Sequence, residues 1–198
     1  MQVTFLGTGS SYGSPIITCQ CPVCHSSNPK DKRLRTSLHL QMRGKSILID
    51  PGPDLRQQAL SAQIQQLDAI LITHEHRDHI AGIDEVKSFC WQQKQSIPLY
   101  GSPQALQHLV QTHSYLFTPP YPFGKPFFTL HPLDEAPFQV FHCTEEPLSI
   151  YHHQLPILGF RIGSLVYITD AKTIPELTLQ KLQGTTLLIV NALQQSPD

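Results

Sequence analysis

The sequence predicts a mixed α/β fold in which layers of helix and sheet pack on one another. Short segments of strand length alternate with segments of helix length, and two of the strands are joined by a hairpin turn. One continuous apolar run, Ala69-Ile70-Leu71-Ile72-Thr73, is typical of a strand that is buried on both faces. The chain has 198 residues, 40% of them hydrophobic, so we expect a single domain over residues 1–198 with a sizeable core.

The elements expected before the buried strand include a hairpin and one helix. Arg43-Gly44-Lys45 provides a tight turn between two alternating segments, and Asp54 stands where a helix N-cap is expected. The elements in this part are a strand over 1–6, an irregular segment over 14–35, strands over 37–42 and 46–50, and a helix over 54–66.

After the buried strand, helices and strands alternate around a proline-rich segment. Pro103 suits the first turn of a helix, and residues 115–138 combine several prolines with aromatic side chains, so we expect a long surface loop there. The elements in this part are helices over 83–93, 103–113 and 174–182, and strands over 97–100, 138–143, 159–162, 165–169 and 186–190.

The composition excludes several classes of protein. The formal net charge is −1 and charged residues make up 15% of the chain, so nucleic acid is not expected as a partner. No apolar run approaches the roughly 20 residues that span a bilayer, which excludes a membrane partner. The first residues lack a basic region followed by a long apolar region, so we expect a cytoplasmic protein without a secretory signal.

A histidine-rich loop follows the buried strand directly and carries the strongest chemical signal. His74-Glu75-His76-Arg77-Asp78-His79 places two histidines two positions apart, so both can face one metal ion, while Asp78 and His79 can face another. Imidazole nitrogen and carboxylate oxygen suit zinc, manganese or iron(II), and a catalytic site leaves one position open for water. The loop therefore predicts a catalytic metal site.

Three cysteines form a second cluster, Cys19-Gln20-Cys21-Pro22-Val23-Cys24. Cysteines this close in sequence cannot build a disulfide framework across a fold, and the chain shows no secretory signal. The spacing of Cys19, Cys21 and Cys24 therefore predicts a metal clip over residues 19–24.

The histidine motif resembles that of the metallo-β-lactamase superfamily, and later segments extend the resemblance. Tyr151-His152-His153 resembles the downstream histidine element, where spacing favours His153 over His152. Tyr167-Ile168-Thr169-Asp170 resembles the element that ends in a bridging aspartate. The resemblance implies a four-layer αββα sandwich with two divalent metals, zinc or manganese, at one edge.

The same resemblance assigns the metal ligands. It implies that His74, His76 and His153 hold the first metal, that Asp78 and His79 hold the second, and that Asp170 bridges the two.

The resemblance also gives roles to residues near the metals. Asp50 matches a carboxylate that fixes the tautomer of a metal-binding histidine. Asp78 is expected to orient the attacking hydroxide as the catalytic residue. The Gly7-Thr8-Gly9-Ser10-Ser11 loop could present N–H groups and hydroxyls to an anion close to the metals, although such loops are also common turns.

The cysteine cluster narrows the resemblance to phosphoribosyl 1,2-cyclic phosphate phosphodiesterases, in which three cysteines hold one structural zinc. The expected function is metal-dependent hydrolysis of a small, cyclic phosphodiester substrate, with a homodimer as a possible assembly. One alternative is a nuclease that resembles the tRNA 3′-processing endonucleases, which share the Leu-Gly-Thr-Gly start. Another is a zinc-binding module that has lost catalysis.

The sequence departs from the superfamily pattern after residue 190. The superfamily places a further active-site histidine, and the family a further structural-zinc histidine, in a C-terminal segment, whereas this sequence ends at Asp198. We therefore expect the last segment of the fold to be missing, with a weaker second metal site, poor phosphodiesterase activity and exposed apolar surface around residues 187–190.

Overall fold

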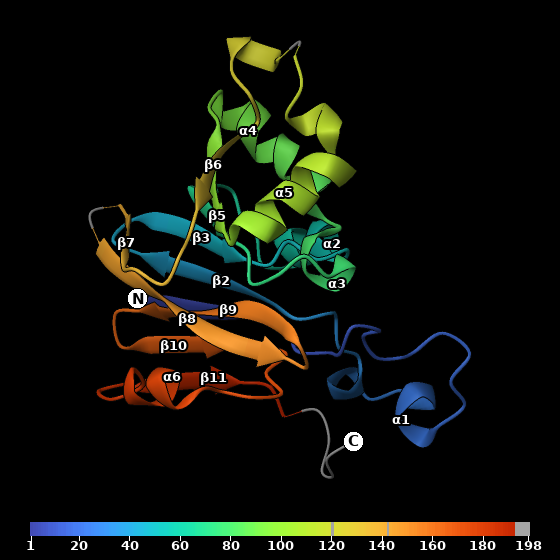
Figure 1. The fold of residues 1–198 in the computed structure, drawn as a ribbon. Helices are drawn as coiled ribbons and strands as arrows, with labels where there is room; N and C mark the ends of the chain where they lie inside the picture. The colour runs from blue at the N-terminus through green and yellow to red at the C-terminus, as the bar shows by residue number, and fades with distance from the viewer. Residues whose placement is uncertain (120, 142, 193–198) are drawn as a thin grey trace.

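Two β-sheets lie face to face in the computed structural model, which describes residues 1–119, 121–141 and 143–192 (Figure 1). Helices α2 to α5 lie on the outer side of the first sheet, and α6 lies outside the second. The four layers confirm the predicted αββα sandwich. The expected domain extends to residue 198, and its last six residues lie outside the described part of the chain.

The first sheet has six strands in chain order, β1 to β6. Strands β1, β2 and β3 pair antiparallel, whereas β3, β4, β5 and β6 pair parallel. The strands are β1 (Gln2–Gly7), β2 (Ser37–Met42), β3 (Lys45–Ile49), β4 (Ala69–Leu71), β5 (Ile97–Gly101) and β6 (Phe128–Pro132).

Both faces of this sheet are buried, which explains its continuous apolar runs. On the helix side, Leu48 and Ile70 pack into a core with residues such as Leu106 from the helical layer. On the other side, Ile47 and Leu71 pack against the second sheet. Successive residues of a strand therefore pack alternately into the core under the helices and the core between the two sheets.

The second sheet has five strands in the order β11-β10-β9-β8-β7. Its strands are β7 (Phe138–Val140), β8 (Cys143–His152), β9 (Leu155–Ile162), β10 (Leu165–Ile168) and β11 (Leu187–Val190). Phe160 and Tyr167 point into the core between the sheets, and Ile150 and Val166 belong to the core on the opposite face. Strand β11 forms one edge, and exposed leucines there match the expectation of apolar surface around residues 187–190.

The helices are short, and apolar residues on one side of α2 to α5 pack against the first sheet. They are α1 (Pro22–His25), α2 (Leu55–Ser61), α3 (Arg77–Ile80), α4 (Lys87–Gln93), α5 (Pro103–Thr112) and α6 (Glu176–Gln180). Ser102 caps α5, with its side chain accepting a hydrogen bond from the Ala105 N–H, and Pro103 occupies the first turn as expected. None of the helices in the described residues is long and apolar enough to cross a membrane.

The structure corrects the helix predicted over residues 54–66. Helix α2 spans only Leu55–Ser61, and Asp54 makes no side-chain capping hydrogen bond. The Asp54 carboxylate instead accepts hydrogen bonds from the backbone N–H and the guanidinium of Arg35. The Asp54 carboxylate therefore binds Arg35, which lies in a distant segment, instead of capping the helix.

Strands β6 and β8 were not predicted. Strand β6 lies inside the expected loop over 115–138, and it is an edge strand with mostly exposed side chains, so it lacks an apolar pattern. Strand β8 contains Glu145 and Pro147, which argue against a central strand. Strand β7 pairs only with Cys143, Thr144 and Glu145 of β8. No residue of β7 therefore lies opposite Pro147, which has no N–H to donate.

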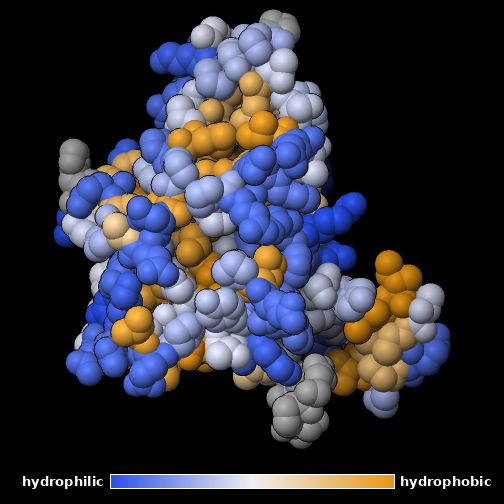
Figure 2. Space-filling model, viewed as in Figure 1, coloured by the Kyte–Doolittle hydropathy of each residue, from blue (hydrophilic) through white to orange (hydrophobic). Residues whose placement is uncertain are grey.

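The segment between β1 and β2 leaves the sandwich and carries the cysteine cluster (Figure 1). It is irregular as predicted, apart from α1 and one 3₁₀ turn over Pro29–Asp31. Figure 2 shows apolar surface on this projecting segment, where Ile16, Ile17 and Val23 are exposed.

Candidate metal centre

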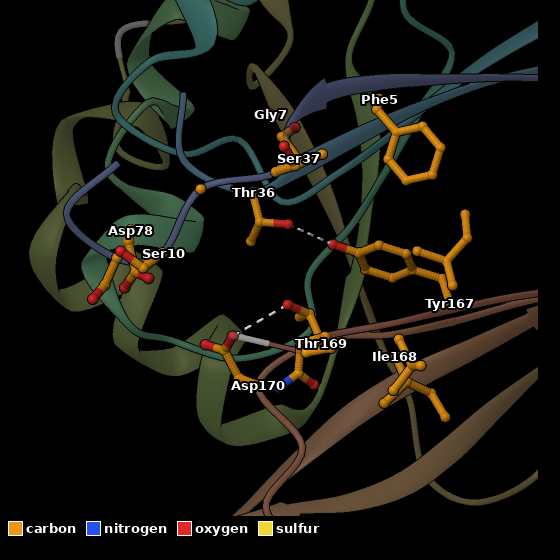
Figure 3. A pocket seen from close by; sticks show the side chains of 17 residues that line it. Phe5, Gly7, Ser10, Thr36, Ser37, Asp78, Tyr167, Ile168, Thr169 and Asp170 are labelled. Atoms are coloured by element: carbon orange, nitrogen blue, oxygen red, sulfur yellow. Dashed lines mark hydrogen bonds between the residues drawn. The ribbon is translucent and has the colours of Figure 1, made fainter. Parts of the chain in front are cut away.

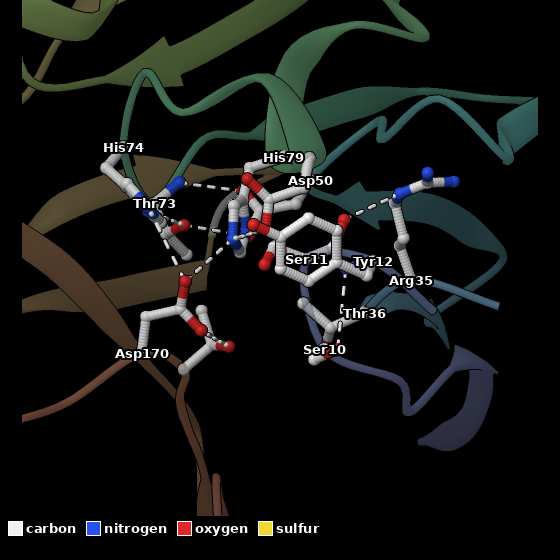
Figure 4. Close-up of polar contacts among 12 residues, drawn as sticks. Ser10, Ser11, Tyr12, Arg35, Thr36, Asp50, Thr73, His74, His79 and Asp170 are labelled. Carbon is white, nitrogen blue, oxygen red and sulfur yellow. Dashed lines mark hydrogen bonds and ion pairs between the residues drawn. The ribbon is translucent and has the colours of Figure 1, made fainter. Parts of the chain in front are cut away.

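The site lies at one edge of the sandwich, where both sheets supply residues that follow the ends of strands. Asp50 follows β3 and His74 comes three residues after β4, so the parallel strands carry both side chains to the same edge. From the second sheet, Asp170 follows β10 after one intervening residue and His152 ends β8. Residues that are far apart in sequence therefore meet in a small volume (Figure 4).

His79 lies at the centre of this arrangement and is completely buried. Its Nδ1 donates to Asp50 Oδ2 at 2.8 Å, which leaves Nε2 facing the site. Nε2 lies 2.9 Å from Asp170 Oδ2 and 3.2 Å from Asp78 Oδ2. Although burial opposes the charged form, the surrounding carboxylates of Asp50 and Asp170 hold the pKa of His79 well above its usual value.

Asp50 is held in turn by Thr73. The Thr73 N–H donates to Asp50 Oδ1 at 2.8 Å and the Thr73 hydroxyl donates to Oδ2 at 2.7 Å. All three side chains of the chain His79–Asp50–Thr73 are shielded from solvent. This matches the role that the sequence analysis gave to Asp50.

The hydroxyl of Thr73 also determines which nitrogen of His74 is free. Its single proton is donated to Asp50, so at the 3.0 Å contact between Thr73 Oγ1 and His74 Nδ1 the imidazole is the donor. His74 Nε2 therefore carries a lone pair, and it is buried without a hydrogen-bond partner in the described residues. Burial, reinforced by the charge of His79, lowers the pKa of His74 to about 3, which keeps the ring neutral.

A buried, neutral imidazole with an unpaired nitrogen is the state in which histidine binds a metal. One ligand atom from each of His74, His79 and Asp170 lies within 4.8 Å of the other two. Asp170 connects the two histidines, since its Oδ2 lies 3.7 Å from His74 Nε2 as well as 2.9 Å from His79 Nε2. The residues present therefore fit divalent metals such as zinc or manganese.

His76 and His152 complete one side of the site. The ring centroid of His74 lies 4.6 Å from that of His76 and 5.8 Å from that of His152, and the rings of His76 and His152 are 5.3 Å apart. Three imidazole rings thus lie next to one another at this edge of the sandwich.

The structure places the ring of His152, rather than that of the expected ligand His153, beside His74 and His76. His152 pairs with Leu155 at the end of the β8–β9 hairpin, which leaves His153 and Gln154 as the two-residue turn. His153 is exposed and has a φ of 55°, and its ring lies 5.0 Å from that of His152 rather than against His74 or His76. Recognition of β8 would have placed His152 in a strand and His153 in the turn.

The two carboxylates of the site are both ionised. Burial opposes their charge, but the hydrogen bond and positive charge of His79 lower the pKa of Asp170 to about 2 and also lower that of Asp78. Two carboxylates and the free Nε2 of His74 suit cations, because each metal ion would offset the negative charge.

A cavity of about 170 Å³ opens beside these carboxylates (Figure 3). Its walls are the loop after β1, the start of β2 and the end of β11. The residues that line it are Phe5, Gly7, Thr8, Gly9, Ser10, Ser11, Thr36, Ser37, Asp78, Tyr167, Ile168, Thr169, Asp170, Ile189, Val190, Asn191 and Ala192. The Gly7–Ser11 loop thus lies next to the metal ligands, where the sequence analysis expected it.

The cysteine cluster forms a separate group on the projecting segment. The sulfur atoms of Cys19, Cys21 and Cys24 lie within 4.8 Å of one another, and all three are free thiols. The Cys24 N–H, assisted by the Cys19 side chain, lowers the pKa of the Cys21 thiol. Although the Ile16 N–H lowers it, burial and the Cys19 and Cys21 side chains raise the pKa of the Cys24 thiol, so of these two thiols only Cys21 favours the thiolate that binds zinc.

The family to which the chain belongs follows from a family model. The model described as "Beta-lactamase superfamily domain" matches residues 45–198. The chain belongs to the metallo-β-lactamase superfamily. The match includes the histidine loop, His152 and Asp170, and the sandwich has the topology that the resemblance implied.

Two curated relatives and one solved structure show how this superfamily member compares with known proteins. A protein of Porphyromonas gingivalis named "Octanoyltransferase" is 43% identical over 197 residues, which are 98% of this chain and 39% of the relative. A "Ribonuclease Z" of Crocosphaera subtropica is 30% identical over 170 residues, which are 82% of this chain and 48% of the relative. The chain therefore spans less than half the length of these curated relatives.

The solved structure is described as a new diphosphatase from the PhnP family. It is 36% identical, with a TM-score of 0.87 over 94% of this chain and 71% of the other.

Proposed function

We propose that this member of the superfamily is a metal-dependent phosphodiesterase that hydrolyses a small phosphodiester. The observation that carries the proposal is the convergence of His74, His79 and Asp170 beside a hydroxyl-lined cavity. The similarity to a PhnP-family diphosphatase over 94% of the chain supports hydrolysis of a phosphate ester or anhydride.

The contacts support one assignment of the ligands. We assign one metal to His74, His76 and His152, a second to Asp78 and His79, and the bridging position to Asp170, whose Oδ2 lies closest to both His74 and His79. When bound, divalent metals supply Lewis-acid chemistry that makes water a better nucleophile and offsets charge on phosphate oxygens. We assign one structural zinc to Cys19, Cys21 and Cys24.

The side chains around the metals prepare the site for attack by water on phosphorus. Asp50 and Thr73 fix the orientation of His79 and His74, so the site is built before the substrate enters. Asp78 has an ionised carboxylate at the wall of the cavity, where it can accept a proton from the attacking water and orient it. One phosphorus–oxygen ester bond breaks, and the products are a phosphate monoester and an alcohol.

A second candidate substrate is the 3′ end of a transfer RNA precursor, because a ribonuclease Z is 30% identical over most of this chain. A net charge of −1 and a charged fraction of 15% do not provide the basic surface that binding to the RNA backbone requires. The small diester is therefore the substrate class that we favour.

An assay of substrate classes tests this function. With zinc or manganese added, the protein should release p-nitrophenol from bis(p-nitrophenyl) phosphate and should leave a tRNA precursor uncut. Asp170→Asn should lower this rate by more than about 100-fold, because even the loss of an outer partner of a ligand costs 10–100-fold. Asp134→Asn, at an exposed aspartate far along the chain from the site, is the matched control and should keep the rate.

The other outcomes are equally informative. Cleavage of the tRNA precursor without turnover of the small diester would favour the nuclease. Metal binding without turnover of either substrate would favour a zinc-binding module.

A further inference from the structure

The loop after β1 is shaped by its contact with residues 33–35. A Cβ at Gly7 would overlap the carbonyl oxygen of Arg35, and a Cβ at Gly9 would lie 2.9 Å from the carbonyl oxygen of Arg33. The Gly9 N–H donates to the Leu34 carbonyl at 2.8 Å, and Gly9 forms a bridge with Arg35. The two backbone segments therefore touch directly, with no side chain between them.

Arg35 links this loop to the start of α2. Its Nε donates to the carbonyl oxygen of Ser11 at 2.8 Å (Figure 4). One terminal nitrogen donates to Asp54 Oδ1 at 2.9 Å, the Arg35 N–H donates to Asp54 Oδ2 at 2.8 Å, and the Arg35 carbonyl accepts a hydrogen bond from Gln58 Nε2 at 2.9 Å. The Asp54 carboxylate thus fixes the Arg35 guanidinium on one side, and on its other side the guanidinium binds the loop after β1 through the Ser11 carbonyl.

The held loop faces the metal ligands across the cavity. Ser10 and Ser11 line the cavity together with Asp78 and Asp170, and Figure 3 shows Ser10 close to Asp78. Arg35 itself is not among the lining residues. Arg35 can act on a molecule in the cavity through the Ser10–Ser11 segment, whose Ser11 carbonyl its side chain holds, and through its chain neighbour Thr36, which lines the cavity.

We propose that Arg35 is a positioning residue that holds Ser10 and Ser11 as the wall that receives the ester substituents of the substrate. The proposal rests on the phosphodiesterase function proposed above. It extends that function by assigning substrate binding to the loop after β1 and loop placement to the Arg35–Asp54 pair. Among the described residues, no hydrogen bond or ion pair joins this pair to the proposed metal ligands, so Arg35 should govern substrate binding and leave metal binding unchanged.

The test compares Arg35→Met and Arg35→Lys with Arg56→Met, which removes an exposed arginine on α2 for which the structure records no ion pair in its described residues. With metal-loaded protein and bis(p-nitrophenyl) phosphate, Arg35→Met should raise KM about tenfold, as expected for one lost charge-assisted hydrogen bond. The kcat should stay within about twofold, since the reacting groups remain in place. Arg35→Lys should restore part of the KM, and all variants should bind as much metal as the wild type.

A second readout does not depend on catalysis. Hydrogen–deuterium exchange at the Gly9 and Gly13 amides, which donate to Leu34 and Ser10, should be faster in Arg35→Met than in Arg56→Met. Equal exchange, or a KM for Arg35→Met equal to that of Arg56→Met, would overturn the proposal. A fall in kcat together with loss of metal would also overturn it. If the wild type shows no turnover, the proposed function fails, and the substrate role of Arg35 fails with it. The exchange rates still test separately whether Arg35 holds the loop in place.

Discussion

At the scale of single residues, strand pairing at the end of β8 decides which of two adjacent histidines lies beside His76. His152 ends the strand with its ring 5.3 Å from that of His76, whereas His153 is exposed in the turn. Two adjacent histidines in a sequence look alike, and only strand pairing determines which one faces the site.

This difference gives a direct prediction. His152→Ala should remove most of the metal that His74 and His76 hold, because it deletes one of three imidazoles around that position. His153→Ala is the matched control and should retain the metal. Elemental analysis of the purified variants measures both. Equal loss of metal in the two variants, or loss only in His153→Ala, would contradict the placement.

A buried carboxyl outside the metal site gives a pH-dependent prediction. Glu145 on β8 is 3% exposed and accepts a hydrogen bond from the Gly163 N–H at 3.0 Å. Burial raises its pKa from 4.5 to about 7. The folded protein therefore binds this proton more tightly than the unfolded chain, so the free energy of unfolding should decrease as the pH rises from 4.5 to about 7.

Glu145→Gln removes this proton equilibrium and keeps the shape of the side chain. The difference in unfolding free energy between variant and wild type, measured by urea denaturation from about pH 5 to about pH 8, should shift in favour of the variant as the pH rises. Glu146→Gln, on the same strand, serves as the comparison. A difference that stays constant with pH would show that the Glu145 carboxyl does not titrate in this range.

Most residues of the candidate metal centre could be proposed from the sequence because they are adjacent in one loop. His74, His76, Asp78 and His79 follow a strand whose apolar run is unmistakable, and their spacing alone indicates metal ligands. Arg35 could not be predicted as a structural link, since its partners Ser11 and Asp54 are 24 and 19 residues away. Such contacts between distant segments form only when the loops at this edge of the sandwich pack together.

At the scale of elements, strands with a clear apolar pattern were predicted, including the edge strands β1 and β11, whereas β6 and β8 were not. Strand β4 is fully buried and its run of apolar residues identified it. Strand β6 has one buried residue out of five, so its sequence resembles a loop. Strand β8 carries Pro147 inside the sheet, which is tolerated only because β7 is short. A run of apolar residues in the sequence therefore marks the predicted strands, and polar residues or a proline conceal β6 and β8.

The attachment of α3 to the first sheet depends on two glycines. A Cβ at Gly82 would overlap the carbonyl oxygen of Gly52, and a Cβ at Gly52 would overlap the carbonyl oxygen of Asp78. The helix that carries Asp78 and His79 therefore lies directly on the loop that carries Asp50. Both glycines maintain the distance between Asp50 and His79.

Gly82→Ala should consequently lower stability by about 1–3 kcal/mol, as overpacking does elsewhere, and should weaken metal binding. A thermal unfolding scan and elemental analysis measure the two effects. Ser88→Ala, at an exposed position on α4, is the control and should change neither. An unchanged melting temperature in Gly82→Ala would mean that the contact between the two backbone segments can relax without cost.

At the scale of the whole molecule, the site joins the two sheets. His74, Asp78 and His79 come from the segment after β4 of the first sheet, and His152 and Asp170 come from β8 and the end of β10 in the second. The core between the sheets, which includes Leu38, Phe160 and Tyr167, fixes the distance between these two sets of ligands. We therefore expect metal binding at the proposed site to be coupled to the packing of the two sheets.

One measurement tests most directly whether His74, His79 and Asp170 form a catalytic metal centre. Metal-free protein is titrated with zinc or manganese, and the rate of phosphodiester hydrolysis is followed. We expect no turnover of bis(p-nitrophenyl) phosphate without metal, and a rate that rises with metal bound in the wild type but not in Asp170→Asn. Turnover that is independent of metal, or an equal rise in Asp170→Asn, would contradict a catalytic centre built on His74, His79 and Asp170.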